Sequence, residues 1–367
     1  MRSVLATTLA LLLVGCGGAT GGQPQTSSPR QTVTPAPNQT PRPVATAAAT
    51  PIPLINVDDM MGMYPQQTLF VATSDHVSAI TLLNHFTRYT IATQGVAEVS
   101  ADRSGRRLYL LDAESPGLRR LRVFDVPTGT QRALLAGITD VAEGRHALGL
   151  ATDGRVLVLK SDTTHAWVDG YQADTLQSLG AVMQGPDCSD RLLTSASRIA
   201  MVCTSSGEVA LDDPRKTKAV VEGALPHLAA AAMAENGTLY LATADEHLAV
   251  LGAGASKLVE ITWPSEWSGT VLADGLAVAQ GGTSGTSIVI AETNADGAWL
   301  RVSAGNDLIQ RTSLRLAGVP HGGVLAMWPF AYYAVDSSIR HIDLTSGLLE
   351  TMAEVGAGAV PGAVVNG

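Results

Sequence analysis

The sequence predicts an all-β fold, a seven-bladed β-propeller, on three observations. From about residue 66 onward, short β-branched and aliphatic runs alternate with Gly, Asp, Asn and Ser, and no long amphipathic helix can be drawn. One strand with its exit turn recurs seven times at a mean spacing of about 44 residues, the length that four strands and their turns need. The 37 Gly and 18 Pro among 367 residues exclude a coiled coil.

The recurring strand is apolar and ends in a polar turn. We interpret each copy as the second strand of a blade, followed by a third strand and, in several blades, by a fourth. A β-sandwich or a β-helix is the alternative, but seven evenly spaced units over about 290 residues are difficult to fit into one sandwich. The seven copies are residues 69–75, 108–112, 148–153, 199–205, 239–245, 288–294 and 331–336.

Two blades also carry a recognisable turn after the third strand. The runs V-F-D-V-P-T-G at 123–129 and I-D-L-T-S-G at 342–347 resemble the turn of YVTN and PQQ-type propeller repeats, which occur in many exported bacterial proteins. No unit has the Trp-Asp ending of WD40 repeats. PQQ-type outer-membrane assembly lipoproteins also join a lipid anchor to a propeller, but that family is expected to have eight blades, and this chain offers seven.

The ring is expected to close through the C-terminus. No clear inner strand precedes residue 69, whereas the seventh unit is complete by residue 355. The leftover run 359–365 (A-V-P-G-A-V-V) is apolar and needs a partner. We therefore place it as the innermost strand of the first blade, with Pro361 at its first residue, where a missing donor is tolerated.

Residues 1–15 predict a lipoprotein signal peptide. A short basic start precedes an apolar stretch over residues 4–14, which is too short to cross a bilayer. The run L-V-G-C that ends at Cys16 resembles the bacterial lipobox, which implies diacylglycerol on Cys16 and cleavage before it. An ordinary secretory signal is the alternative. The expected location is extracytoplasmic, lipid-anchored to the bacterial cell membrane or outer membrane.

Residues 16–53 predict a disordered Pro/Thr-rich tether, and residues 54–367 the propeller. Eight of the 18 prolines lie between residues 17 and 53, a stretch too poor in apolar side chains to offset its ordering entropy. The net charge of −9 argues against nucleic acid as a partner. We expect a monomer that meets the membrane through its lipid.

Propeller geometry predicts a binding face around one mouth of the central channel. The loops that lead from one blade into the innermost strand of the next, which we call lead-in loops, lie there together with the turns after the second strands. The acids of these turns have two interpretations: Asp favours tight turns, or the carboxylates form a surface for a cation or a cationic partner. Trp267 is a candidate exposed platform for a sugar or a partner. The candidate residues of this mouth are Asp75, His76, Asp140, Asp187, His227, His247, Trp267 and His321.

No catalytic motif is recognisable, and the catalytic residues are unknown. No cofactor is predicted, although His227 and His321 follow prolines at the same repeat phase and are candidate ligands for a divalent metal; inherited repeat sequence is the alternative. The favoured function is a non-catalytic, envelope-anchored propeller that binds a protein or a polysaccharide of the envelope. The alternative is a hydrolase or lactonase-like enzyme with a metal at the acidic mouth.

The other two cysteines predict a disulfide. Export places the domain outside the reducing cytoplasm, where paired thiols are normally oxidised. Cys203 ends the second strand of the fourth blade, and Cys188 precedes its innermost strand. A hairpin turn near Ser195 would bring the two cysteines opposite each other, within the range that a disulfide accepts. Two buried free thiols are the alternative.

Overall fold

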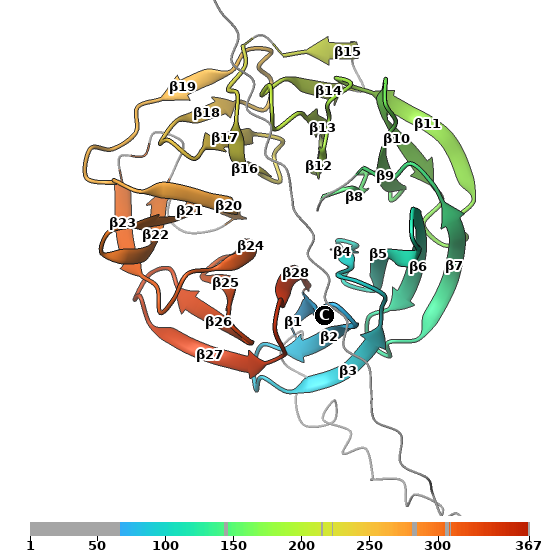
Figure 1. The fold of residues 1–367 in the computed structure, drawn as a ribbon, viewed down its shortest axis with the longest axis horizontal. Helices are drawn as coiled ribbons and strands as arrows, with labels where there is room; N and C mark the ends of the chain where they lie inside the picture. Colours follow the sequence, from blue (N-terminus) through green and yellow to red (C-terminus); the bar gives the residue numbers. More distant parts are fainter. Residues whose placement is uncertain are drawn as a thin grey trace, which may run out of the picture. The chain divides into compact units, whose positions relative to one another are not determined.

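The structure, a computed structural model, describes residues 67–142, 146–213, 216–221, 223–280, 285–304, 308 and 310–365. Within these ranges the chain forms seven four-stranded antiparallel sheets arranged around a central channel (Figure 1). This confirms the all-β, seven-bladed prediction. Among the described residues, no helix is long and apolar enough to cross a membrane. The predicted signal peptide, the lipidation site Cys16 and the tether lie outside the described residues.

Each blade runs from an innermost strand at the channel to an outermost strand at the rim. In this order, the strands of blades one to three are β28 (Val360–Val365), β1 (Thr68–Ala72), β2 (His76–Thr81) and β3 (Thr87–Ala92); β4 (Glu98–Ala101), β5 (Arg107–Ser115), β6 (Leu118–Asp125) and β7 (Gln131–Ile138); β8 (Leu148–Leu150), β9 (Val156–Ser161), β10 (Ala166–Tyr171) and β11 (Ser178–Gln184).

Blades four to seven follow the same order. Their strands are β12 (Arg191–Thr194), β13 (Ile199–Val202), β14 (Val209–Asp213) and β15 (Lys216–Val220); β16 (Leu228–Met233), β17 (Leu239–Thr243), β18 (Leu248–Leu251) and β19 (Val259–Ile261); β20 (Thr270–Gln280), β21 (Thr286–Asn294), β22 (Gly297–Ala304) and β23 (Gln310–Arg315); β24 (His321–Met327), β25 (Phe330–Val335), β26 (Ser338–Asp343) and β27 (Leu349–Glu354).

The C-terminal strand closes the ring, as predicted. β28 pairs antiparallel with β1, with Thr68 opposite Val365 and Ala72 opposite Val360. Pro361 is the second residue of β28 rather than the first, and it pairs with Val71 beside a register shift in the ladder. The irregularity explains why a residue without an N–H is accepted there.

One predicted second strand is wrong. In the third blade, residues 148–150 form the innermost strand β8, and the second strand is β9, at Val156–Ser161. The run L-G-L-A-T-D ends in a tight turn, as the true second strands do, but its turn connects the first strand to the second. Asp153 therefore lies on the face opposite the lead-in loops. A strand and its turn look the same in sequence at either position, because both are short apolar runs before a polar turn.

The hydrophobic core lies mainly between neighbouring blades. The second strands are its main component: all five residues of β1 and of β17, and all four of β13, are buried. Six clusters of buried side chains fill the spaces, one of which joins the last blade to the first through Tyr332, Leu69 and Ile80. Each blade is therefore stabilised by both of its neighbours. The innermost strands of the blades line the channel.

Candidate binding pocket in the central channel

The eight residues predicted from the sequence all lie on the face of the lead-in loops. Asp140, Asp187, His227 and Trp267 lie in lead-in loops, and His321 is the first residue of β24. Three more lie in or directly after the turns that connect second to third strands: Asp75, His76 and His247. The topology thus groups them by face, although it distributes them over different blades.

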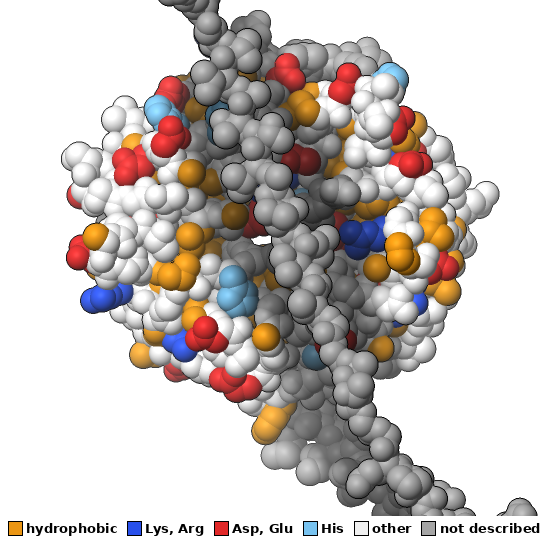
Figure 2. Space-filling view, in the orientation of Figure 1, with side chains coloured by type: hydrophobic (Ala, Val, Ile, Leu, Met, Phe, Trp, Pro, Cys, Tyr) orange, Lys and Arg blue, Asp and Glu red, His pale blue; other side chains and the backbone are white. Residues whose placement is uncertain are grey.

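The acids of these turns are occupied by local hydrogen bonds. The Thr73 hydroxyl and the His76 ring both bind the Asp75 carboxylate, at 2.9 and 2.7 Å, and these hydrogen bonds hold the pKa of Asp75 below its ordinary value. The His247 ring lies 2.5 Å from the Glu260 carboxylate, a contact that raises the pKa of His247. Among the side chains visible in Figure 2, carboxylates are spread over the ring rather than gathered in one patch. These contacts favour the interpretation that the acids serve their turns.

The prediction that Trp267 is an exposed platform is wrong. Its side chain is 1% exposed and packs in the core between the fifth and sixth blades. Trp263 is the more exposed of the two, and its indole N–H donates to the Trp267 carbonyl at 2.7 Å. The two rings meet edge to face, with centroids 5.8 Å apart. Pro264 turns the chain between them, and the sequence alone did not show which ring this turn directs inward.

His227 and His321 are not brought together with carboxylates into a metal-binding group. His227 is exposed in the lead-in loop of the fifth blade, and the His321 ring donates from Nε2 to the Asp336 carbonyl at 3.0 Å. Within the described part of the chain, the one group of three potential metal ligands contains neither histidine. The repeat phase that they share therefore does not correspond to a shared site.

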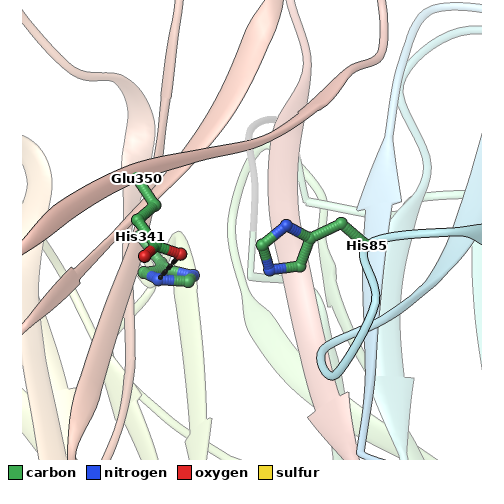
Figure 3. Close-up of side chains that lie close together, drawn as sticks. All are labelled: His85, His341 and Glu350. Carbon is green, nitrogen blue, oxygen red and sulfur yellow. Dashed lines mark ion pairs between the residues drawn. The ribbon is translucent and has the colours of Figure 1, made fainter.

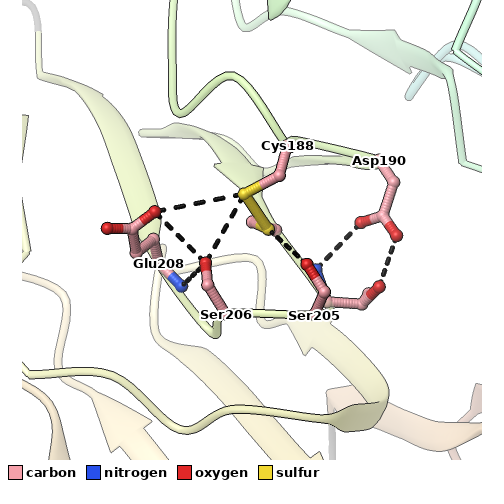
Figure 4. Close-up of a disulfide and its surroundings, with 7 residues drawn as sticks. Cys188, Asp190, Ser205, Ser206 and Glu208 are labelled. Carbon is pink, nitrogen blue, oxygen red and sulfur yellow. Dashed lines mark hydrogen bonds between the residues drawn. A yellow bond between two sulfur atoms is a disulfide. The ribbon is translucent and has the colours of Figure 1, made fainter. Parts of the chain in front are cut away.

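The disulfide partners lie at the lead-in loop of the fourth blade (Figure 4). The structure joins Cys188 to Cys203, with their Cα atoms 5.2 Å apart. The ladder pairs Arg191 with Val202, so the register places Asp190, not Cys188, opposite Cys203. The predicted hairpin register is therefore wrong, and Cys188 reaches its partner from the loop before β12. Asp190 binds the Thr204 backbone N–H at 3.0 Å, which fixes the same loop from its other end.

A cavity of about 530 Å³ lies at the channel on the lead-in side. None of the eight predicted residues lines it. Its wall comes mainly from inner strands and from the residues just before them, together with Ala72 at the end of β1 and Arg119 near the start of β6. It combines small apolar side chains with four charged or ionisable groups. The residues that line it are Ala72, Val96, Ala97, Glu98, Val99, Arg119, His146, Leu148, Ala231, Asp274, Leu276, Gly322, Gly323, Val324, Leu325, Val360, Pro361 and Gly362.

Asp274 enters this cavity because the inner strand β20 bulges. The ladder between β20 and β21 jumps from Val271 opposite Glu292 to Leu276 opposite Ile290, so the residues between them are unpaired. Asp274 has a φ of 56°, in the left-handed region that few side chains adopt. A β-bulge redirects a side chain in this way.

The bulge of β20 fits against a second bulge in β24. There, His321 pairs with Ala334 and Val324 with Tyr333, and two glycines fill the interval. A Cβ atom on Gly323 would lie 2.9 Å from the Cβ of Asp274, and the φ of Gly323 is +94°. Only glycine fits this position without displacing Asp274.

The side chains of His146 and Arg191 hold the Asp274 carboxylate. The His146 ring lies 3.1 Å from Asp274 Oδ1, and the Arg191 guanidinium makes a short ion pair with the same oxygen. Burial opposes ionisation of Asp274, but the hydrogen bonds and charges of His146 and Arg191 outweigh it and hold its pKa well below its usual range. Asp274 is thus an ionised carboxylate whose charge is already matched.

Glu98 is in the opposite electrostatic situation. It begins β4, and its Oε2 accepts the Leu148 backbone N–H at 2.8 Å. Burial raises the pKa of Glu98, and the Leu148 N–H and the His146 and Arg119 charges offset this only in part. The same wall contains the Arg119 guanidinium, for which no hydrogen-bond or ion-pair partner is found within the described ranges. The cavity therefore offers unused cationic donors next to a carboxyl group that resists ionisation.

No family model matches the sequence, and no curated protein matches it. Solved structures share its fold. A functionally unknown protein from Desulfotomaculum acetoxidans has a TM-score of 0.60 at 10% identity, with 81% of this chain and 99% of that chain covered. A candidate 6-phosphogluconolactonase from Bacteroides uniformis has a TM-score of 0.54 at 14% identity, covering 82% and 99%. Such likenesses support the propeller fold alone, and the YVTN and PQQ resemblance stays a prediction.

Proposed function

We propose that this chain is a lipid-anchored, non-catalytic binding protein of the cell envelope, and that its channel pocket takes an acidic group of an envelope protein or polysaccharide. The observation that carries the proposal is the Arg119 guanidinium, which lines the cavity without a hydrogen-bond or ion-pair partner in the described part of the chain. A guanidinium binds carboxylate or phosphate through paired hydrogen bonds.

The rest of the wall supports an anionic group over a cation. Asp274 is already neutralised by Arg191 and His146, so it does not repel an incoming carboxylate. Burial raises the pKa of Glu98, so the cost of protonating this carboxyl group beside a bound anion is lower than for an ordinary surface carboxylate. Apolar side chains such as Val96 and Leu148 supply contact for the non-ionic part of the ligand.

The anchor belongs to the same proposal and depends on the sequence. The L-V-G-C run ending at Cys16 supports lipidation, and the 37 flexible tether residues after Cys16 would reach on the order of 35 Å from the membrane. If Cys16 is lipidated, the protein should partition into detergent after membrane extraction, and its intact mass should match a chain that begins at modified Cys16. A Cys16→Ala variant that is still processed at the same site and stays membrane-bound would contradict the anchor.

A thermal-shift titration tests the pocket. We expect glucuronate, gluconate or inorganic phosphate to raise the melting temperature of the protein, and neutral glucose to have no effect. At a ligand concentration one hundred times the Kd, the gain is about 2.7 kcal/mol. Arg119→Gln should weaken binding about ten- to a hundredfold, since a charge-assisted hydrogen bond is lost. Arg132→Gln is the control, because this side chain is exposed on the outermost strand β7. An unchanged response in Arg119→Gln would contradict the proposal.

A hydrolase is the second candidate, and Glu98 favours it. A carboxyl group with a raised pKa beside a cation is suited to general acid–base catalysis. Proteins from Bacteroides uniformis and Bacteroides fragilis with this fold are named as candidate 6-phosphogluconolactonases. Turnover of 6-phosphogluconolactone above the uncatalysed rate, lost in Glu98→Gln, would replace the binding proposal. Metal analysis of the purified protein tests the divalent metal expected of such an enzyme.

A further inference from the structure

A cluster of three potential metal ligands lies where the last blade meets the first (Figure 3). His341 belongs to β26 and Glu350 to β27, both in the seventh blade, whereas His85 lies in the loop between β2 and β3 of the first. That loop connects a third strand to a fourth, so it lies on the face opposite the lead-in loops. The cluster is therefore separate from the channel pocket.

The ligand atoms of the cluster converge. One nitrogen of each histidine and one oxygen of Glu350 all lie within 4.8 Å of one another. His341 and Glu350 are directly opposite in the ladder, with Nε2 and Oε2 3.3 Å apart. The His85 ring approaches nearly perpendicular to the His341 ring, with centroids 5.6 Å apart. Figure 3 shows His85 directed from its loop toward the other two side chains.

The His341 side chain is held by its packing, and the backbone of His85 is held by a tight turn. The His341 side chain is 12% exposed and packs against the rings of Phe330 and Tyr332, at centroid distances of 5.0 and 6.2 Å. His85 has a φ of 60°, and its backbone N–H donates to the Thr81 carbonyl at 3.0 Å. A non-glycine residue in the left-handed region is uncommon, and a tight turn that holds one directs its side chain.

We propose that His85, His341 and Glu350 bind Zn²⁺ across the seam at which the ring closes. Two imidazoles and a carboxylate are a ligand set that Zn²⁺ accepts, with a fourth position left for water, whereas Mg²⁺ and Ca²⁺ prefer oxygen ligands alone. Zinc–nitrogen distances of about 2.0–2.1 Å place tetrahedral ligands about 3.3 Å apart, so the cluster needs to contract. His85 can supply this movement because its loop is at the surface, with Leu83 and Phe86 66% and 69% exposed.

Metal binding at this seam would stabilise the closed ring. The metal would connect the seventh blade to the first, in which the β28–β1 ladder closes the ring and which shares an apolar cluster with the seventh. A ligand that binds only the folded state raises stability with its concentration. Zinc is therefore expected to raise the temperature at which the ring opens, without any need for an occupant in the channel pocket.

Zinc titration of the EDTA-treated full-length protein tests the site. We expect one Zn²⁺ per chain, a rise in melting temperature, and no rise with Mg²⁺ or Ca²⁺. Cobalt substitution should give the visible absorption of a tetrahedral site. His85→Ala and Glu350→Gln should each weaken binding by about tenfold or more. Both positions are exposed enough for the variants to fold even where His341→Ala does not.

The matched control is His247→Ala. His247 and Glu260 form an exposed cross-strand pair at 2.5 Å but are not part of a described three-ligand group. Zinc affinity should be unchanged in this variant. The proposal is wrong if the protein as purified and stripped does not bind Zn²⁺, or if His247→Ala reduces binding as much as His85→Ala does.

Discussion

His146 and Asp274 are 128 residues apart in the sequence, yet His146 Nε2 lies 3.1 Å from Asp274 Oδ1. His146 precedes the inner strand of the third blade, and Asp274 belongs to the inner strand of the sixth, on the other side of the channel (Figure 1). Arg191 of the fourth blade binds the same carboxylate and also the Ala229 carbonyl of the fifth. One carboxylate thus links blades that share no strand ladder.

Asp274→Ala should destabilise the fold. The substitution leaves the Arg191 guanidinium without its carboxylate, and losing hydrogen bonds to a charged group costs roughly 1.5–3 kcal/mol. Because the pKa of Asp274 is lowered by folding, its stabilisation is complete above the unfolded-state pKa of about 3.9 and is lost as pH falls through the folded-state pKa. Urea unfolding at pH 7 and pH 3 measures this. Asp75→Ala, at an exposed turn, is the control; a similar loss there would contradict the assignment.

Glu98→Gln should have the opposite effect. Folding raises the pKa of Glu98, so ionising it costs stability once the pH exceeds the unfolded-state value of about 4.3. Glutamine keeps an oxygen to accept the Leu148 N–H but carries no charge. We expect the variant to melt at a higher temperature than wild type at pH 7–8, and the difference to disappear near pH 4. A variant that is less stable at every pH would contradict this prediction, because it would show that the Glu98 carboxylate has the hydrogen bonds that it needs.

Gly323→Ala tests whether the two bulges are coupled. The added Cβ would meet the Asp274 Cβ at 2.9 Å in a backbone conformation with φ of +94°. Gly356 is the matched control, since its φ is +105° but nothing lies within 4 Å of its added Cβ. Both variants incur roughly 1–2 kcal/mol of backbone strain, and Gly323→Ala a further 1–3 kcal/mol from the clash. Equal losses in thermal unfolding would refute the coupling.

Much of the ring could be predicted from the sequence because the structural needs of each blade produce the sequence repeat. Each blade needs four strands, and the buried second strand leaves an apolar run about every 44 residues. The closing strand followed from counting, since an apolar run at residues 359–365 had no other partner. The second strand of the third blade was assigned wrongly because β8 has only three residues and its turn resembles the turn of a second strand.

The pocket was less accessible to sequence reasoning. The cavity lies on the face that the sequence pointed to, but the choice of residues followed the turns, where Asp is common for local reasons. Asp274 does leave a trace, since A-D-G interrupts the otherwise apolar inner strand at residues 273–275. The partners Arg191 and His146 leave none, because only the closed ring brings them to Asp274. Likewise, nothing in the sequence distinguishes Trp263 from Trp267 across a proline.

Removing β28 should strongly destabilise the ring. Deletion of residues 357–367 exposes the inner edge of β1 and takes away the buried Val360 and Val365. Burying each valine is worth roughly 1.5–3 kcal/mol, so a loss of at least about 3 kcal/mol is expected. Deletion of residues 366–367, which follow β28, is the control. If the longer truncation melts like the full chain, β28 does not close the ring.

The Cys188–Cys203 bond should stabilise the lead-in loop of the fourth blade and the domain with it. The cysteines are 15 residues apart, and closing such a loop is worth roughly 3 kcal/mol in the chain-entropy model. In a Cys16→Ala background, the denatured, non-reduced protein should contain no free thiol, and two after reduction.

Cys188→Ser separates the bond from the packing around it, because Cys188 is exposed whereas Cys203 is fully buried. The variant should melt at a lower temperature than the unsubstituted domain, and a reductant should have no further effect on it. The same reductant should lower the melting temperature of the unsubstituted domain. Two free thiols in the non-reduced sample would mean that the pair is reduced in the purified protein. The loop before β12 would then be held by its hydrogen bonds, among them those from Thr204 to Asp190 and from the Asp190 N–H to the Val202 carbonyl.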